Sequence, residues 1–129
     1  MEKVVAINIK KKFTLAEAQD LLPLIIKITK DSSEHVKPLI SQAEVLSTYP
    51  RDERLDSLEA RINELVERWQ TKIEKLGALP KGLWLVDFDN GQGYFCWKFP
   101  ERKILYQHGY QDGFSGRIKI YDEEPQPTL

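Results

Sequence analysis

Apolar residues recur every three or four positions through most of residues 13–77, the period that places side chains on one face of an α-helix. Thr14 and Glu17 have the spacing of a capping box, so we expect the first helix to begin beside them. Its seam follows the three- and four-residue steps of a coiled coil and is interrupted by two hydroxyl side chains. The seam positions are Leu15, Ala18, Leu22, Ile25, Thr29, Ser32, Val36, Leu39, Ala43 and Leu46.

Two prolines, Pro23 and Pro38, lie inside this helical pattern. Each proline removes one helical hydrogen bond and crowds the carbonyl group four residues earlier in the chain. The sequence therefore predicts a kink or a short break at both places, and one straight helix is not expected.

A second helical pattern follows a turn at residues 49–50. Asp52 can cap this helix, and Gly77 followed by Pro80 ends it. Its apolar positions are Leu55, Leu58, Ile62, Leu65, Val66, Trp69, Ile73 and Leu76. Because the connection is short, the two helices must form an antiparallel hairpin. The first helix is the longer one, so we expect strands to cover its unpartnered base at residues 15–24.

Aromatic and β-branched residues separated by turn residues replace the helical period in the rest of the chain, which is typical of short strands. We expect strands at 4–9, 83–88, 93–99, 103–110 and 117–121, with a hairpin turn at 89–91. An acidic tail at 122–129 should fray. The sequence thus predicts an α+β fold in which a long antiparallel helical hairpin, residues 13–77, packs at its base on a small antiparallel β-sheet, residues 82–121.

Composition and charge fit one domain over residues 1–129, with 41% hydrophobic and 30% charged residues. The net charge of -1 provides no field that would attract nucleic acid or a membrane. Cys96 is the single cysteine, so no intramolecular disulfide is possible, and neither a secretory signal nor a membrane-spanning run is recognised. We therefore expect a cytoplasmic location without membrane or nucleic-acid partners.

Four side chains of the strand region are of types that bind metals, namely Asp87, Cys96, Glu101 and His108. Their spacings match no metal-binding motif, so the sequence predicts no metal site. Cys96 is expected to behave as a small buried hydrophobe, and Asp87 as a solvated or turn-capping carboxylate. His108 ends a strand beside a loop, where it either reaches a ligand or hydrogen-bonds a backbone carbonyl.

The densest local signal is the run from Gly113 to Arg117. Two glycines around an aromatic residue can turn backbone N–H groups toward one anion, and an adjacent arginine can clamp a phosphate or carboxylate. The competing interpretation is a tight turn with Phe114 buried and Arg117 bridging to a carboxylate of the fold. The ligand-site hypothesis names His108, Gly113, Phe114, Gly116, Arg117 and Glu101.

Four ordered pieces of the chain resemble an uncharacterised prokaryotic family, the "domain of unknown function 2203". The pieces are FTLAEAQDLLPLI at 13–25, GLWLVDF at 82–88, CW at 96–97 and H-x-x-x-x-G-F-x-G-R at 108–117. Members of the family usually carry Arg and then Gly-Glu after the Cys-Trp pair, and often Trp before the histidine. Here Lys98, Pro100-Glu101 and Gln107 stand at those positions. The family has no established activity, so the resemblance implies nothing about activity, and the cofactors stay unknown.

Two classes of function remain open, and catalysis is the less expected. The first is an interaction module that forms a homodimer or binds a protein partner through the hairpin. The evidence for this class is the broad apolar face at Val66, Trp69 and Ile73, together with a seam that contains Thr29 and Ser32. The second is a small-ligand or anion-binding site, enzymatic or metal-binding, around residues 108–117. The sequence identifies no catalytic residue.

Overall fold

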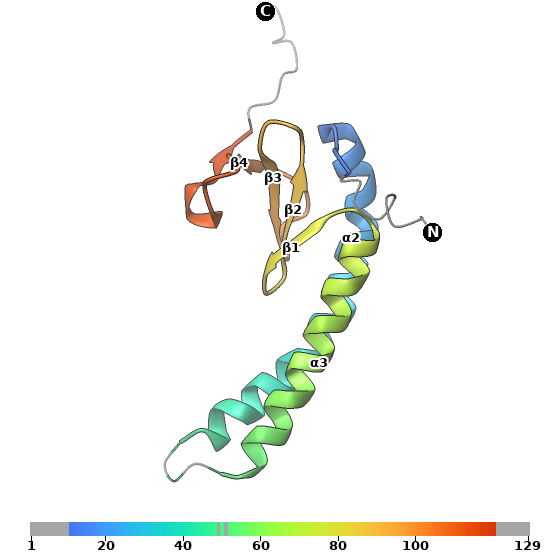
Figure 1. The fold of residues 1–129 in the computed structure, drawn as a ribbon. Helices are drawn as coiled ribbons and strands as arrows, with labels where there is room; N and C mark the ends of the chain where they lie inside the picture. Colours follow the sequence, from blue (N-terminus) through green and yellow to red (C-terminus); the bar gives the residue numbers. More distant parts are fainter. Residues whose placement is uncertain (1–10, 49, 51, 121–129) are drawn as a thin grey trace, which may run out of the picture.

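In the part of the chain that the structure describes, a long helical hairpin projects from a five-stranded antiparallel sheet (Figure 1). The structure is a computed structural model that describes residues 11–48, 50 and 52–120. The hairpin comprises α2 (Leu15–Leu46) and α3 (Arg54–Lys75), and the sheet has the order β1-β2-β3-β4-β5. Its strands are β1 (Leu79–Gly82), β2 (Leu85–Asp89), β3 (Tyr94–Lys98), β4 (Tyr106–His108) and β5 (Ile118–Lys119). The predicted α+β fold is confirmed, whereas the predicted strand at 4–9 and the tail at 122–129 lie outside the described residues.

The helix ends lie where the capping residues indicate. The Thr14 hydroxyl accepts a hydrogen bond from the Glu17 N–H, and the Glu17 carboxylate accepts one from the Thr14 N–H. At the start of α3 the N-cap residue is Glu53, and the carboxylate of Asp52, one residue earlier than the cap, accepts a hydrogen bond from the Arg54 N–H at 2.8 Å. Gly77 has a φ of 91° directly after α3, a conformation that favours glycine at a helix end.

Helix α2 continues across both of its prolines, so of the predicted kink or short break the break is wrong, and a kink stays a prediction. Each proline still leaves one carbonyl group without its helical partner. Apolar packing holds the helix together on either side, because Leu22 and Ile25 are buried beside Pro23 and Val36 is buried beside Pro38. Tertiary packing therefore outweighs the local preference to break.

A buried hydrogen bond joins the two helices at the polar part of the seam. The Trp69 indole N–H donates to the Thr29 hydroxyl at 2.8 Å, and both residues are fully buried. The Trp69 ring also meets Trp84 of the sheet region edge to face, with centroids 5.0 Å apart. The hydroxyl at Thr29 is thus satisfied inside the chain.

The sheet covers the base of α2, as the unequal helix lengths predict. Ala18, Leu22 and Ile25 belong to one buried cluster with Val86, Phe88, Phe95 and Trp97 of the strands. The side-chain amide of Gln19 extends this contact by accepting from the Ile104 N–H and donating to the Ile104 carbonyl. One core therefore joins the helical hairpin to the sheet.

The strands are shorter than predicted, and one was missed. Strand β1 was not predicted because its sequence, LPKG, lacks the strand pattern, and its proline is tolerated because β1 is an edge strand of the sheet that the described residues form. Leu83 and Trp84 form the turn that follows, with a φ of 58° at Trp84, so β2 begins only at Leu85. The strands predicted at 103–110 and 117–121 are reduced to three and two residues.

Candidate metal centre

The sheet has two faces of opposite character because successive side chains of a strand alternate between its faces. One face packs on the helices and carries Val86, Phe88, Phe95 and Trp97. We call the other the polar face; its side chains in β2, β3 and β4 include Asp87, Asp89, Tyr94, Cys96, Tyr106 and His108. The register pairs Asp87 with Cys96, and Tyr94 with His108, so polar groups of three strands become neighbours.

Three metal-binding side chains of the polar face converge. Asp87, Cys96 and His108 each offer one donor atom, and these atoms lie within 4.8 Å of one another. All three residues are buried. The expectation that Cys96 is buried is confirmed, whereas the expectation that Asp87 is a solvated or turn-capping carboxylate is wrong. The spacing along the sequence shows no motif because each donor comes from a different strand.

Hydrogen bonding fixes the imidazole of His108. Its Nδ1 atom lies 2.9 Å from the Gly109 carbonyl oxygen, and its Nε2 atom lies 3.0 Å from Asp87 Oδ2. Both ring nitrogens are therefore engaged, and neither is left to take a proton from Cys96. This arrangement argues against a cysteine nucleophile activated by histidine, which needs a hydrogen bond between the two side chains.

One oxygen of the cluster lacks a partner. Asp87 Oδ1 is buried without a hydrogen bond among the described residues. An unsatisfied buried polar atom costs about 1–3 kcal/mol, and more when the group is charged. A polar atom of this kind needs an explanation, and a bound ion is one.

The thiol of Cys96 is held in its protonated form. Burial, followed by the neighbouring Asp87 carboxylate, raises the pKa of Cys96 to about 12, against an opposing effect of Arg117. A free thiolate is therefore disfavoured at neutral pH. A coordinated metal ion removes this proton, since thiol ligands bind metals as thiolates.

Arg117 is held firmly at the edge of the polar face. Its guanidinium donates two hydrogen bonds to Glu101, at 2.7 and 3.1 Å, and lies 4.0 and 4.2 Å from the ring centroids of Tyr106 and Phe114. The interpretation of Arg117 as a bridge to a carboxylate of the fold is confirmed. Phe114, however, is 38% exposed, so its predicted burial is wrong.

The glycine-rich run forms a short 3-10 helix at Phe114–Gly116. The N–H groups of Gly116 and Arg117 donate to the carbonyls of Gly113 and Phe114, so these two donors are occupied within the run. Of the sequence-predicted site residues, His108 joins the buried cluster, and Glu101 pairs with Arg117. Gly113 and Gly116 shape the adjoining loop.

Sequence reasoning did not select Asp87 and Cys96 as site residues. A signal was available, because both are polar or reactive residues in the middle of otherwise apolar strands, in VDF and FCW. Lys81 was also missed, and its Nζ atom lies 3.7 Å from Asp87 Oδ2. Its position depends on β1, which the sequence did not predict.

Fold and site together define a class of α+β protein. A helical hairpin covers one face of its sheet, and the other face of the sheet carries a buried polar cluster. The chain belongs to DUF2203, a family described as an uncharacterized conserved protein, which matches residues 11–120. No curated protein and no solved structure matches the chain. Among the described residues, no helix is long and apolar enough to cross a membrane.

Proposed function

We propose that the protein binds one thiophilic metal ion, best suited to Zn²⁺, through Asp87, Cys96 and His108. The observation that carries this proposal is the convergence of three buried donor atoms within 4.8 Å, beside an unpartnered carboxylate oxygen. Such a site supplies sulfur, nitrogen and oxygen ligands from three adjacent strands. Rigid strands suit this task because they hold the ligands in a fixed geometry.

The donor set selects the class of metal. Thiolate, imidazole and carboxylate are the three ligand types found at protein zinc sites. Calcium and magnesium prefer oxygen ligands alone, so a sulfur donor disfavours them. Three protein ligands also leave one position of a tetrahedral ion open, as in zinc sites that bind a water molecule or a substrate.

Groups next to the ligands support the proposal. A histidine that binds a metal commonly donates its other N–H to a carbonyl or a carboxylate, and the Gly109 carbonyl has this position at His108. The guanidinium of Arg117 opposes the rise in the pKa of Cys96, which favours the thiolate form that binds a metal. A reducing cytoplasm, which the single cysteine suggests, would keep Cys96 available as a ligand.

The competing explanation is a structural hydrogen bond between His108 and Asp87 without any metal. That explanation accounts for Asp87 Oδ2 but leaves Oδ1 without a partner among the described residues. Metal content separates the two. We expect native mass spectrometry of protein purified without chelator to show one bound ion, and cobalt(II) titration to produce a thiolate-to-cobalt charge-transfer band.

Matched variants locate the ion. Cys96→Ser should lose the charge-transfer band, and His108→Asn should lose most of the bound metal, while His35→Asn should retain it because His35 is exposed on α2. Circular dichroism would confirm that the variants fold. Absence of both bound metal and a cobalt band in the folded parent protein would refute the proposal.

The second candidate function is self-association, most simply as a homodimer, through the helical hairpin. A groove of about 580 Å³ between α2 and the turn regions of the sheet supports it, because Ile40, Trp84 and Phe99 give the groove an apolar part beside charged side chains of α2. Trp69 and Ile73 are buried within the chain and no longer support this idea. Light scattering at high micromolar concentration tests it, and a monomer would reject it.

A further inference from the structure

The cationic side chain of Lys81 lies beside the proposed metal centre and is partly exposed to solvent. Lys81 places its Nζ atom 3.7 Å from Asp87 Oδ2 and 4.2 Å from the ring centroid of Tyr94. The Lys81 side chain is 38% exposed, whereas Asp87, Cys96 and His108 are buried. A ligand that arrives on this side meets the ammonium group before it reaches the metal.

The charges around the centre do not cancel once a divalent ion is bound. The ion is neutralised by the Asp87 carboxylate and the Cys96 thiolate, and Arg117 is neutralised by Glu101. The carboxylate of Asp87 then neutralises the metal ion, so it no longer neutralises the Lys81 ammonium group. Because the Lys81 side chain is 38% exposed, water compensates part of this charge, and a bound anion could compensate the rest. One negative charge on the open metal position would restore the balance.

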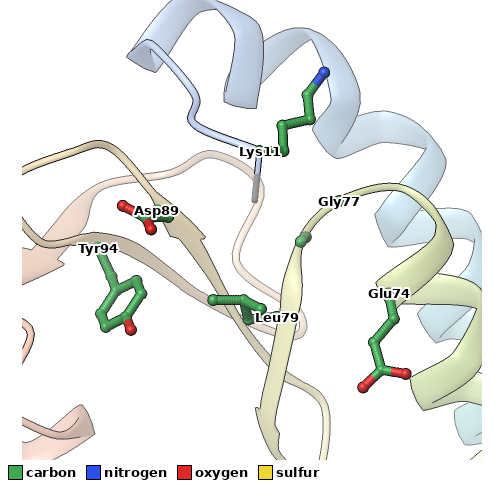
Figure 2. A pocket seen from close by; sticks show the side chains of 7 residues that line it. Lys11, Glu74, Gly77, Leu79, Asp89 and Tyr94 are labelled. Carbon is green, nitrogen blue, oxygen red and sulfur yellow. The ribbon is translucent and has the colours of Figure 1, made fainter. Parts of the chain in front are cut away.

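A small cavity lies next to this part of the polar face, and neighbours of the ligands, not the ligands themselves, line it. A pocket of about 250 Å³ is lined by Lys11, Glu74, Gly77, Ala78, Leu79, Asp89 and Tyr94 (Figure 2). Leu79 is the register partner of Asp87, and the Tyr94 ring lies 5.4 Å from the His108 ring, so two pocket walls contact metal ligands. Leu79, Ala78 and the Tyr94 ring give the pocket an apolar part that suits a short hydrocarbon chain.

We infer that the centre binds a small monocarboxylate, with the carboxylate on the open metal position beside Lys81 and the apolar body in the pocket between Leu79 and Tyr94. This inference rests on the proposed metal site. A carboxylate carries the single negative charge that the site lacks, and its second oxygen can accept a hydrogen bond from the ammonium group. Phosphate, which carries more charge at neutral pH, suits the site less well.

The test uses the 129-residue chain saturated with cobalt(II), whose visible absorption reports the ligands of the metal. Acetate and butyrate should each shift the visible bands in a saturable way. Butyrate should act at roughly tenfold lower concentration, because it places two further CH₂ groups in the apolar pocket. Lys81→Met, measured at saturating cobalt, should keep the charge-transfer band and lose the response to both acids. Lys72→Met, an exposed lysine of α3, is the matched control and should respond like the parent.

The outcomes separate this inference from the proposal on which it rests. A charge-transfer band without any response to carboxylates would overturn the inference and leave the metal site standing. An equal response in parent and Lys81→Met would also overturn it, and tighter binding of inorganic phosphate would show that the ligand class is wrong. Failure to bind cobalt would overturn both.

Discussion

On the helix face of the sheet Val86, Phe88 and Trp97 are buried, and on the polar face Asp87, Cys96 and His108 are buried to a similar degree. Burial on the helix face is favourable by itself, since each large apolar side chain contributes about 1.5–3 kcal/mol. Burial on the polar face is unfavourable unless every polar group finds a partner, and Asp87 Oδ1 has none among the described residues. Stability therefore accounts for the helix face, whereas on the polar face one buried carboxylate oxygen is left for the proposed ligand to satisfy.

The largest expected effect belongs to the helix face. Phe88 is fully buried and meets Phe13 edge to face at 5.3 Å, so Phe88→Ala should lower the free energy of unfolding by about 3–5 kcal/mol. Urea unfolding followed by tryptophan fluorescence measures this change. Phe114→Ala, at a partly exposed ring, is the control and should cost much less. Equal losses in the two variants would contradict the assignment of the core to the helix face.

A ligand should stabilise the polar face. Zinc at about 100 times its dissociation constant should raise the free energy of unfolding by about 2.7 kcal/mol, because it binds the folded chain alone. Thermal melting with and without zinc measures the gain, which a chelator should reverse. His108→Asn should melt at the same temperature in both conditions. A parent protein that zinc leaves unchanged would remove the contrast between the two faces.

The hairpin shows what a buried polar group does when its partner lies within the chain. Thr29→Val keeps the side-chain shape but leaves the Trp69 indole N–H without its acceptor, so we expect a loss of about 1–3 kcal/mol in the free energy of unfolding. Thr48→Val alters a hydroxyl that bonds an exposed carbonyl and should change the value little. A neutral Thr29→Val variant would show that a buried donor without a partner is tolerated here, which would weaken the argument from Asp87.

The helical hairpin could be predicted from the sequence because its signals are local. The capping pair Thr14 and Glu17 and the apolar period place the helices, and unequal helix lengths place the sheet on the base of α2. The cluster could not be predicted, because Asp87, Cys96 and His108 meet only through strand register, which spacing along the chain does not encode. Strand β1, with Lys81, lacks a strand pattern and depends on its pairing with β2.

The smallest expected effect tests whether the glycine-rich loop beside the polar face is a ligand site. Gly113 has a φ of -101°, and a Cβ atom added there would meet no atom within 4 Å. Alanine fits this conformation, so Gly113→Ala should stabilise the protein by about 0.4–1 kcal/mol through the entropy of the unfolded chain. Gly91→Ala is the contrasting variant and should destabilise, because Gly91 has a φ of 93° in the turn between β2 and β3. Thermal melting measures both changes, and cobalt binding to Gly113→Ala should equal that of the parent. Loss of cobalt binding in a folded, stable Gly113→Ala protein would extend the site into this loop and contradict its assignment to architecture.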